Sequence, residues 1–194
     1  MTRYLVLLLC FFFSMNAFSQ KLVSRFADRH INQRASGAMV QYGFNYYDLP
    51  EGYAYRPLLL AHYQRFPLIK TAKKVGLAID IGPQIGMAYT DKFNFELGLF
   101  VYLNLGIALT DWDMISLLAG AGPYYISVET ERQAKGFIFS DNFLLAYRRK
   151  LLLSREPYEI SVYSGFRHIS NASLKQPNGG IDNIIIGLGF AKLF

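Results

Sequence analysis

A histidine, a serine and an aspartate lie close together near the C-terminus, with the side-chain types that nucleophilic hydrolysis requires. His168 precedes Ser170 by two residues, and Asp182 follows a polar loop that contains Asn178 and a glycine pair. A serine hydroxyl becomes nucleophilic when an imidazole removes its proton, and a carboxylate on the far ring nitrogen orients that imidazole. The spacing therefore predicts a triad with Ser170 as nucleophile, His168 as base and Asp182 as acid.

The three candidate side chains should share one face of two neighbouring strands. Residues of even number form the apolar row in both flanking segments, and His168, Ser170 and Asp182 are also even. Alternate residues of a strand point to the same face, and residues two apart lie about 6.5–7 Å from each other. An imidazole and a hydroxymethyl group can close that gap, so the parity favours a working site on the outer face.

Two long alternating runs show what kind of strand must position these side chains. In residues 75–87 and again in residues 93–105, the odd positions are apolar and the even positions are mostly small or polar. A strand of a soluble protein has about 5–6 residues, whereas a strand that crosses a membrane needs about 9–11. Length together with alternation is typical of a transmembrane β-barrel.

The chain contains eight such segments, separated by stretches rich in turn-forming residues. An even number suits a closed antiparallel barrel, and closure is required because lipid cannot satisfy an open sheet edge. We therefore predict an all-β fold, an eight-stranded antiparallel transmembrane β-barrel of the outer membrane. Its strands should lie near residues 38–47, 53–66, 75–89, 92–108, 114–128, 135–149, 157–170 and 181–194.

The N-terminus indicates export. Arg3 is followed by an unbroken apolar run that is too short to span a membrane, and then by small residues around Ser19. We interpret residues 1–19 as a signal peptide, 20–36 as a lead-in segment and 37–194 as the barrel. The single cysteine, Cys10, lies within the signal, so disulfides and thiol catalysis are excluded from the mature chain.

The net charge of the chain indicates which classes of partner it could bind. The chain has 20 Lys and Arg against 14 Asp and Glu, a formal net charge of +6. Because an exported protein does not meet nucleic acid, anionic lipid or lipopolysaccharide phosphate is the better partner. The acidic residues show no metal-ligand spacing and no nucleotide-binding loop is present, so we expect no metal and no cofactor.

The run from His168 to Ala172, followed by Pro177, Asn178 and the glycine pair, resembles the signature of the outer-membrane lipid A 3-O-deacylase (PagL-like) family. The resemblance implies a hydrolase that removes one ester-linked acyl chain from the lipid A of lipopolysaccharide. It also implies that Asn178 is an oxyanion donor, supported by Gly179 and Asn171. Family members often carry glutamate where Asp182 stands.

The end of the chain and the topology complete this interpretation. Phe194 closes an alternating strand, which resembles the signal read by the barrel assembly machinery. With both termini periplasmic, the loop 171–180 is the seventh connection and faces outside. The triad would then face the outer leaflet, where lipopolysaccharide lies.

Several alternatives stay open at this stage. A small structural or adhesion barrel without catalysis is one, and an acyltransferase barrel with a similar site is another. Asp141 is the rival to Asp182 as the third triad member, because Ser140 to Asn142 interrupt the sixth segment and leave its parity uncertain. Parity in the second segment assigns His62 to the lumen, and His30 precedes the barrel without a recognisable pattern.

Overall fold

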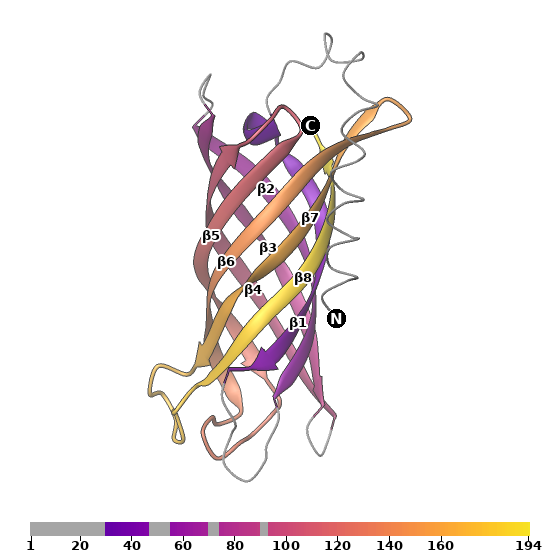
Figure 1. The fold of residues 1–194 in the computed structure, drawn as a ribbon. Helices are drawn as coiled ribbons and strands as arrows, with labels where there is room; N and C mark the ends of the chain where they lie inside the picture. The colour runs from indigo at the N-terminus through magenta and orange to yellow at the C-terminus, as the bar shows by residue number, and fades with distance from the viewer. Residues whose placement is uncertain (1–29, 47–54, 70–73, 90–92) are drawn as a thin grey trace.

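The computed structural model describes residues 30–46, 55–69, 74–89 and 93–194, and these form a closed barrel (Figure 1). The chain enters through a short 3₁₀ helix, η3 (His30–Asn32). Eight strands follow in the order in which they pair, and β1 closes the barrel against β8. They are β1 (Ala35–Asn45), β2 (Arg56–Ile69), β3 (Val75–Tyr89), β4 (Phe93–Ala108), β5 (Asp113–Ile126), β6 (Gly136–Leu153), β7 (Glu156–Ser170) and β8 (Ile181–Leu193).

The predicted fold is confirmed: the barrel has eight antiparallel strands, each paired with its neighbours in the sequence. The sixth strand is longer than expected and runs through Ser140 and Asn142 without interruption. The proposed signal peptide and most of the lead-in segment, together with residues 47–54, lie outside the described residues. Among the residues that the structure describes, no helix is long and apolar enough to cross a membrane.

The outer surface of the barrel is an apolar belt, and the alternation of β4 shows how it forms. Leu99 and Leu103 are 54% and 50% exposed. Phe100 and Tyr102, which lie between them in the sequence, are buried in the lumen. The odd residues of β3 and β4 therefore face lipid, as the sequence predicts. The outward row is apolar and contacts lipid, while the inward row packs inside the barrel. Neither row then exposes apolar side chains to water, and this is why these sequences form membrane strands.

Many side chains are buried in the lumen, and several of them are charged. The Glu159 carboxylate accepts hydrogen bonds from Arg65 Nη1 at 2.9 Å and Arg148 Nη1 at 2.8 Å. Both arginines also pair with Asp80. Buried charges persist only when they are paired, because removing one partner leaves the other uncompensated at a cost of about 3–5 kcal/mol. This network, which we call the lumenal ion cluster, ties β2, β3, β6 and β7 together.

Two histidines lie where the sequence did not predict. His62 points outward and its Nε2 lies 3.3 Å from Ser36 Oγ, so its assignment to the lumen was wrong. His30, which carried no signal in the sequence, is buried in the lumen with its Nε2 2.5 Å from the Glu159 carboxylate. η3 therefore closes one end of the barrel by joining the lumenal ion cluster.

The two ends of the barrel differ. η3 and the C-terminus lie at one end, and the loop 171–180 lies at the other (Figure 1). Strands β7 and β8 lead into and out of this loop, so the residues at the end of β7 and the start of β8 are brought to one rim. The predicted triad residues belong to this rim.

Candidate active site

The antiparallel register of β7 and β8 places His168 directly opposite Asp182. His168 Nδ1 lies 2.6 Å from Asp182 Oδ1, a short distance that fits a charge-assisted hydrogen bond. Both side chains point outward and are partly exposed, at 34% and 20%. The carboxylate on Nδ1 leaves Nε2 as the ring nitrogen that can take a proton from a nucleophile.

Ser170 is the last residue of β7 and follows His168 on the same outer face. Within the described part of the chain, no hydrogen bond joins the Ser170 hydroxyl to the His168 ring. Nucleophile and base are often loosely aligned in the absence of substrate and tighten only when it binds.

Gly180 lies against the edge of the His168 imidazole that carries Cε1 and Nε2. Its φ of +68° lies in the left-handed region, which favours glycine. A Cβ atom at this position would lie 2.5 Å from His168 Cε1 and 3.1 Å from Nε2. The ring is thus held between the Asp182 carboxylate on one edge and the bare backbone of Gly180 on the other.

The loop 171–180 is braced by its own asparagines. The Asn171 backbone N–H donates to Asn178 Oδ1 at 2.7 Å, and Asn171 Nδ2 donates to the Lys175 carbonyl at 2.7 Å. Asn178 Nδ2 makes a longer bond of 3.3 Å to Ser173 Oγ. The Asn178 carboxamide and the backbone and side-chain N–H groups of Asn171 therefore hold the loop in shape beside Ser170.

Gly179 is hydrogen-bonded to Arg132, which lies outside the loop 171–180. Its N–H donates to the carbonyl of Arg132 at 2.5 Å, and its own carbonyl accepts from Arg132 Nη2 at 2.8 Å. The Gly179 amide already has an acceptor, so it is not poised to bind an oxyanion. Sequence reasoning missed Arg132, because nothing in the chain around it indicates a contact with residues almost fifty positions away.

Asp141, the rival acid, also lies on the outer face beside the histidine. Strand β6 pairs with the other edge of β7, and Asp141 is the cross-strand partner of His168 on that side. The two carboxylates thus flank the imidazole from opposite strands. The one in hydrogen-bond contact with the ring is Asp182.

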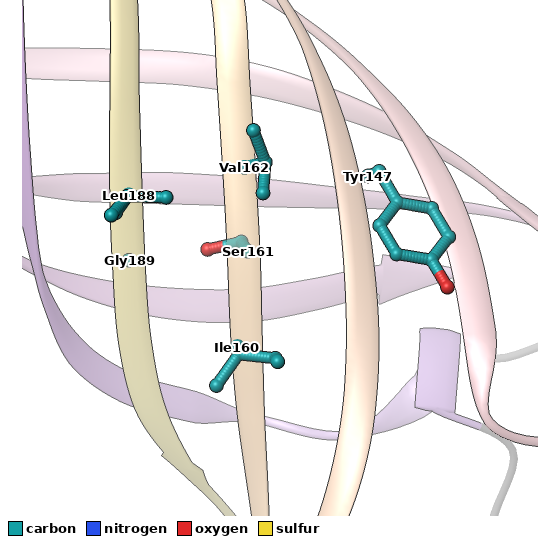
Figure 2. A pocket seen from close by; sticks show the side chains of 6 residues that line it. All are labelled: Tyr147, Ile160, Ser161, Val162, Leu188 and Gly189. Carbon is teal, nitrogen blue, oxygen red and sulfur yellow. The ribbon is translucent and has the colours of Figure 1, made fainter. Parts of the chain in front are cut away.

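An apolar groove lies on the same outer face, further along β6, β7 and β8 (Figure 2). Val162 in its wall precedes Ser170 by eight residues, or about 26 Å along a strand. The groove is thus toward the end of the barrel that η3 closes and does not touch the triad residues. It is lined by Tyr147, Ile160, Ser161, Val162, Leu188 and Gly189.

The described residues contain no group of three or more His, Cys, Asp or Glu side chains that could hold a metal ion. The chemistry that the rim itself offers is that of its serine, imidazole and carboxylate. These are the side-chain types that a nucleophile, a base and an orienting acid require.

Comparison with known proteins connects this barrel to a family. The solved crystal structure of the outer membrane enzyme PagL superimposes with a TM-score of 0.58 at 16% sequence identity, covering 79% of this chain and 97% of that one. No curated protein matches the sequence. Residues 68–191, which are more than half of the chain and include all of the triad residues, match the family described as Lipid A 3-O-deacylase (PagL). The chain therefore belongs to the PagL family of lipid A 3-O-deacylases, outer-membrane enzymes with a β-barrel fold.

Proposed function

We propose that the protein is a serine esterase that hydrolyses the ester-linked acyl chain at the 3-position of lipid A. The observation that carries the proposal is the hydrogen-bonded pair of His168 and Asp182 on the outer face of the barrel, with Ser170 next on the same row. Ionisable side chains are costly on a lipid-facing surface and contribute nothing to packing there. Membership of the deacylase family supports a catalytic role for these ionisable side chains.

The reaction follows from the geometry. Ser170 Oγ attacks the carbonyl carbon of the ester while His168 Nε2 takes its proton, and Asp182 stabilises the imidazolium that forms. The tetrahedral intermediate collapses when the imidazolium gives the proton to the departing sugar oxygen, leaving an acyl-serine. Water then attacks the acyl-serine with His168 again as base, and the products are the free fatty acid and lipid A with a hydroxyl at position 3.

The oxyanion formed on the ester carbonyl needs donors close to Ser170. Since the Gly179 amide is taken by Arg132, the best remaining candidates are the Asn178 side chain and the Gly180 amide. The bond from Asn178 Nδ2 to Ser173 is long at 3.3 Å and can be exchanged for one to the oxyanion. One such donor typically contributes about 2.7–4 kcal/mol to transition-state stabilisation.

The site should face the outer leaflet, because the loop 171–180 is at the end of the barrel opposite to the C-terminus (Figure 1). Lipopolysaccharide would then enter sideways from the membrane, with its acyl chains along the apolar outer face. An acyltransferase would need an enclosed cavity to measure the chain that it moves. The lumen instead holds the charged lumenal ion cluster, which is a poor environment for an acyl chain, so hydrolysis on the outer face is the better interpretation.

The test compares purified wild-type protein with the Ser170→Ala and His168→Ala variants on lipopolysaccharide. Mass spectrometry should show loss of one acyl chain from lipid A with the wild type only, while all three proteins keep the heat-modifiable mobility of a folded barrel. Because the triad supplies both base and nucleophile, a chelator should leave the rate unchanged. Release of the chain by Ser170→Ala would exclude serine catalysis. If no protein releases a chain from any lipid A, a structural barrel becomes the better description.

A further inference from the structure

Two loops at the rim of the barrel are joined by backbone contacts. The loop that connects β5 to β6 (residues 127–135) forms an isolated bridge to the loop 171–180 between Gln133 and Asn178. The Ala134 N–H donates to the Pro177 carbonyl at 2.9 Å, and the Gly179 N–H donates to the Arg132 carbonyl at 2.5 Å. The loop that carries the proposed oxyanion donors is therefore tied to a second loop from a different hairpin.

The second loop is itself built to be rigid at the point of contact. Thr130 Oγ1 accepts from the backbone N–H groups of Arg132 at 3.2 Å and Gln133 at 2.9 Å, and the Thr130 N–H donates to the Gln133 carbonyl. Threonine hydroxyls stabilise such turns by accepting hydrogen bonds from their own backbone. Gln133 is fully buried beneath it. The turn thus presents the Arg132 side chain in one direction.

The Arg132 guanidinium contacts the Gly179–Gly180 peptide, which lies against the His168 ring. Its Nη2 donates to the Gly179 carbonyl at 2.8 Å, and its Nε would lie 3.2 Å from a Cβ atom on Gly179. A peptide unit is planar, so the carbonyl of Gly179 and the N–H of Gly180 point in opposite directions. Holding the carbonyl therefore sets the direction of the Gly180 N–H and the place of the Gly180 Cα against the His168 ring.

We propose that Arg132 is a positioning residue for the reaction, which fixes the Gly179–Gly180 peptide and through it the imidazole of His168. The charged donor also draws electron density toward the Gly179 oxygen, which makes the N–H on the same peptide a stronger donor for an oxyanion. This inference rests on the proposed function, since it assigns a role only if Ser170 and His168 carry out the hydrolysis.

A matched control separates positioning from the general effect of positive charge on an anionic substrate. Lys135 belongs to the same loop and carries the same charge, and its ammonium group lies 3.2 Å from the Glu129 carboxylate in an exposed pair. Removing Lys135 takes away one positive charge from the rim without touching the contacts to Gly179. The conservative change Arg132→Lys keeps the charge and one donor but loses the planar fork.

The experiment measures kcat and KM of the purified barrel on micellar lipopolysaccharide. Because a displacement of about 1 Å at a reacting group can cost about a hundredfold in rate, Arg132→Ala should lower kcat by about ten- to a hundredfold with KM little changed. Arg132→Lys should recover part of kcat, and Lys135→Ala should match the wild type. Heat-modifiable mobility should be the same for all four proteins.

The outcomes distinguish this inference from the proposed function. If Ser170→Ala is inactive and Arg132→Ala has wild-type kcat, the positioning role is wrong while serine hydrolysis stands. If Arg132→Ala raises KM and leaves kcat unchanged, the guanidinium binds substrate and does not position the peptide. If Ser170→Ala is active, both proposals fail together. Equal loss of kcat in Arg132→Ala and Lys135→Ala would also overturn the inference, because charge alone would then explain the effect.

Discussion

Replacing Gly180 with alanine should leave the barrel folded and remove most of the proposed activity. A Cβ atom at this position would lie 2.5 Å from His168 Cε1, whereas ordinary contact begins at 3.4 Å, so the ring must move by about 0.9 Å. A shift of that size at a catalytic group costs about a hundredfold in rate. The left-handed φ of +68° adds about 1–2 kcal/mol of backbone strain, which is small beside the stability of a closed barrel.

Gly136 offers a matched control for this prediction. It also has a positive φ, +117°, but a Cβ atom there would meet no other atom within 4 Å. Gly136→Ala therefore introduces backbone strain at the same end of the barrel without displacing a side chain. The assay is release of the acyl chain at saturating lipopolysaccharide, with heat-modifiable mobility as the measure of folding. Wild-type kcat in Gly180→Ala, or an equal fall in both variants, would refute the argument that contact with the ring matters.

Three further perturbations test the site and the barrel. Asp182→Asn should leave the barrel folded and lower the rate of hydrolysis strongly, because the amide can hold the wrong imidazole tautomer. If Asp141→Asn abolishes activity and Asp182→Asn does not, the triad is misassigned. Leu99→Asp, on the exposed row of β4, should destabilise the barrel by about 2 kcal/mol or more, seen as a lower unfolding temperature of the heat-modifiable band. Glu159→Gln should cost about 3–5 kcal/mol, because Asp80 alone would then face the two buried guanidinium groups of Arg65 and Arg148. An unchanged urea midpoint would contradict the stabilising role of the lumenal ion cluster.

The parts of the fold that the sequence predicts are those where one row of each strand is apolar and the other is not. Strands β3 and β4 have this pattern over their whole length, so their faces follow directly from the sequence. In β2, Leu58, Leu59 and Leu60 are consecutive and both rows are apolar near its start. The odd and even rows of β2 then cannot be told apart by hydropathy. The sequence therefore predicts His62 in the lumen, although it faces outward.

Long-range contacts explain the other failures. His30 is buried only because Glu159, 129 residues away in the chain, presents its carboxylate inside the closed barrel. The contact between Arg132 and Gly179 likewise depends on how two loops from different hairpins meet at the rim. In contrast, His168 and Ser170 are two positions apart on one strand, and a single hairpin brings Asp182 to them. Local geometry alone was enough to predict that His168 and Asp182 lie opposite each other and that Ser170 follows on the same face.

The position of the proposed triad at the end of β7 fits the cost of charge in lipid. A basic side chain on the outer face of a barrel costs about 2–4 kcal/mol at the midplane but only about 0–1 kcal/mol near the interface. His168 and Ser170 are among the last residues of β7 and Asp182 is among the first of β8, so the imidazolium of the proposed reaction would arise at the rim. The inner row of β7 stays rigid behind it, because Arg167 is paired with Glu96 and donates to Ser140 Oγ at 2.9 Å. The strand can therefore hold a charged, outward-facing site in place at the end of the barrel, where charge costs least.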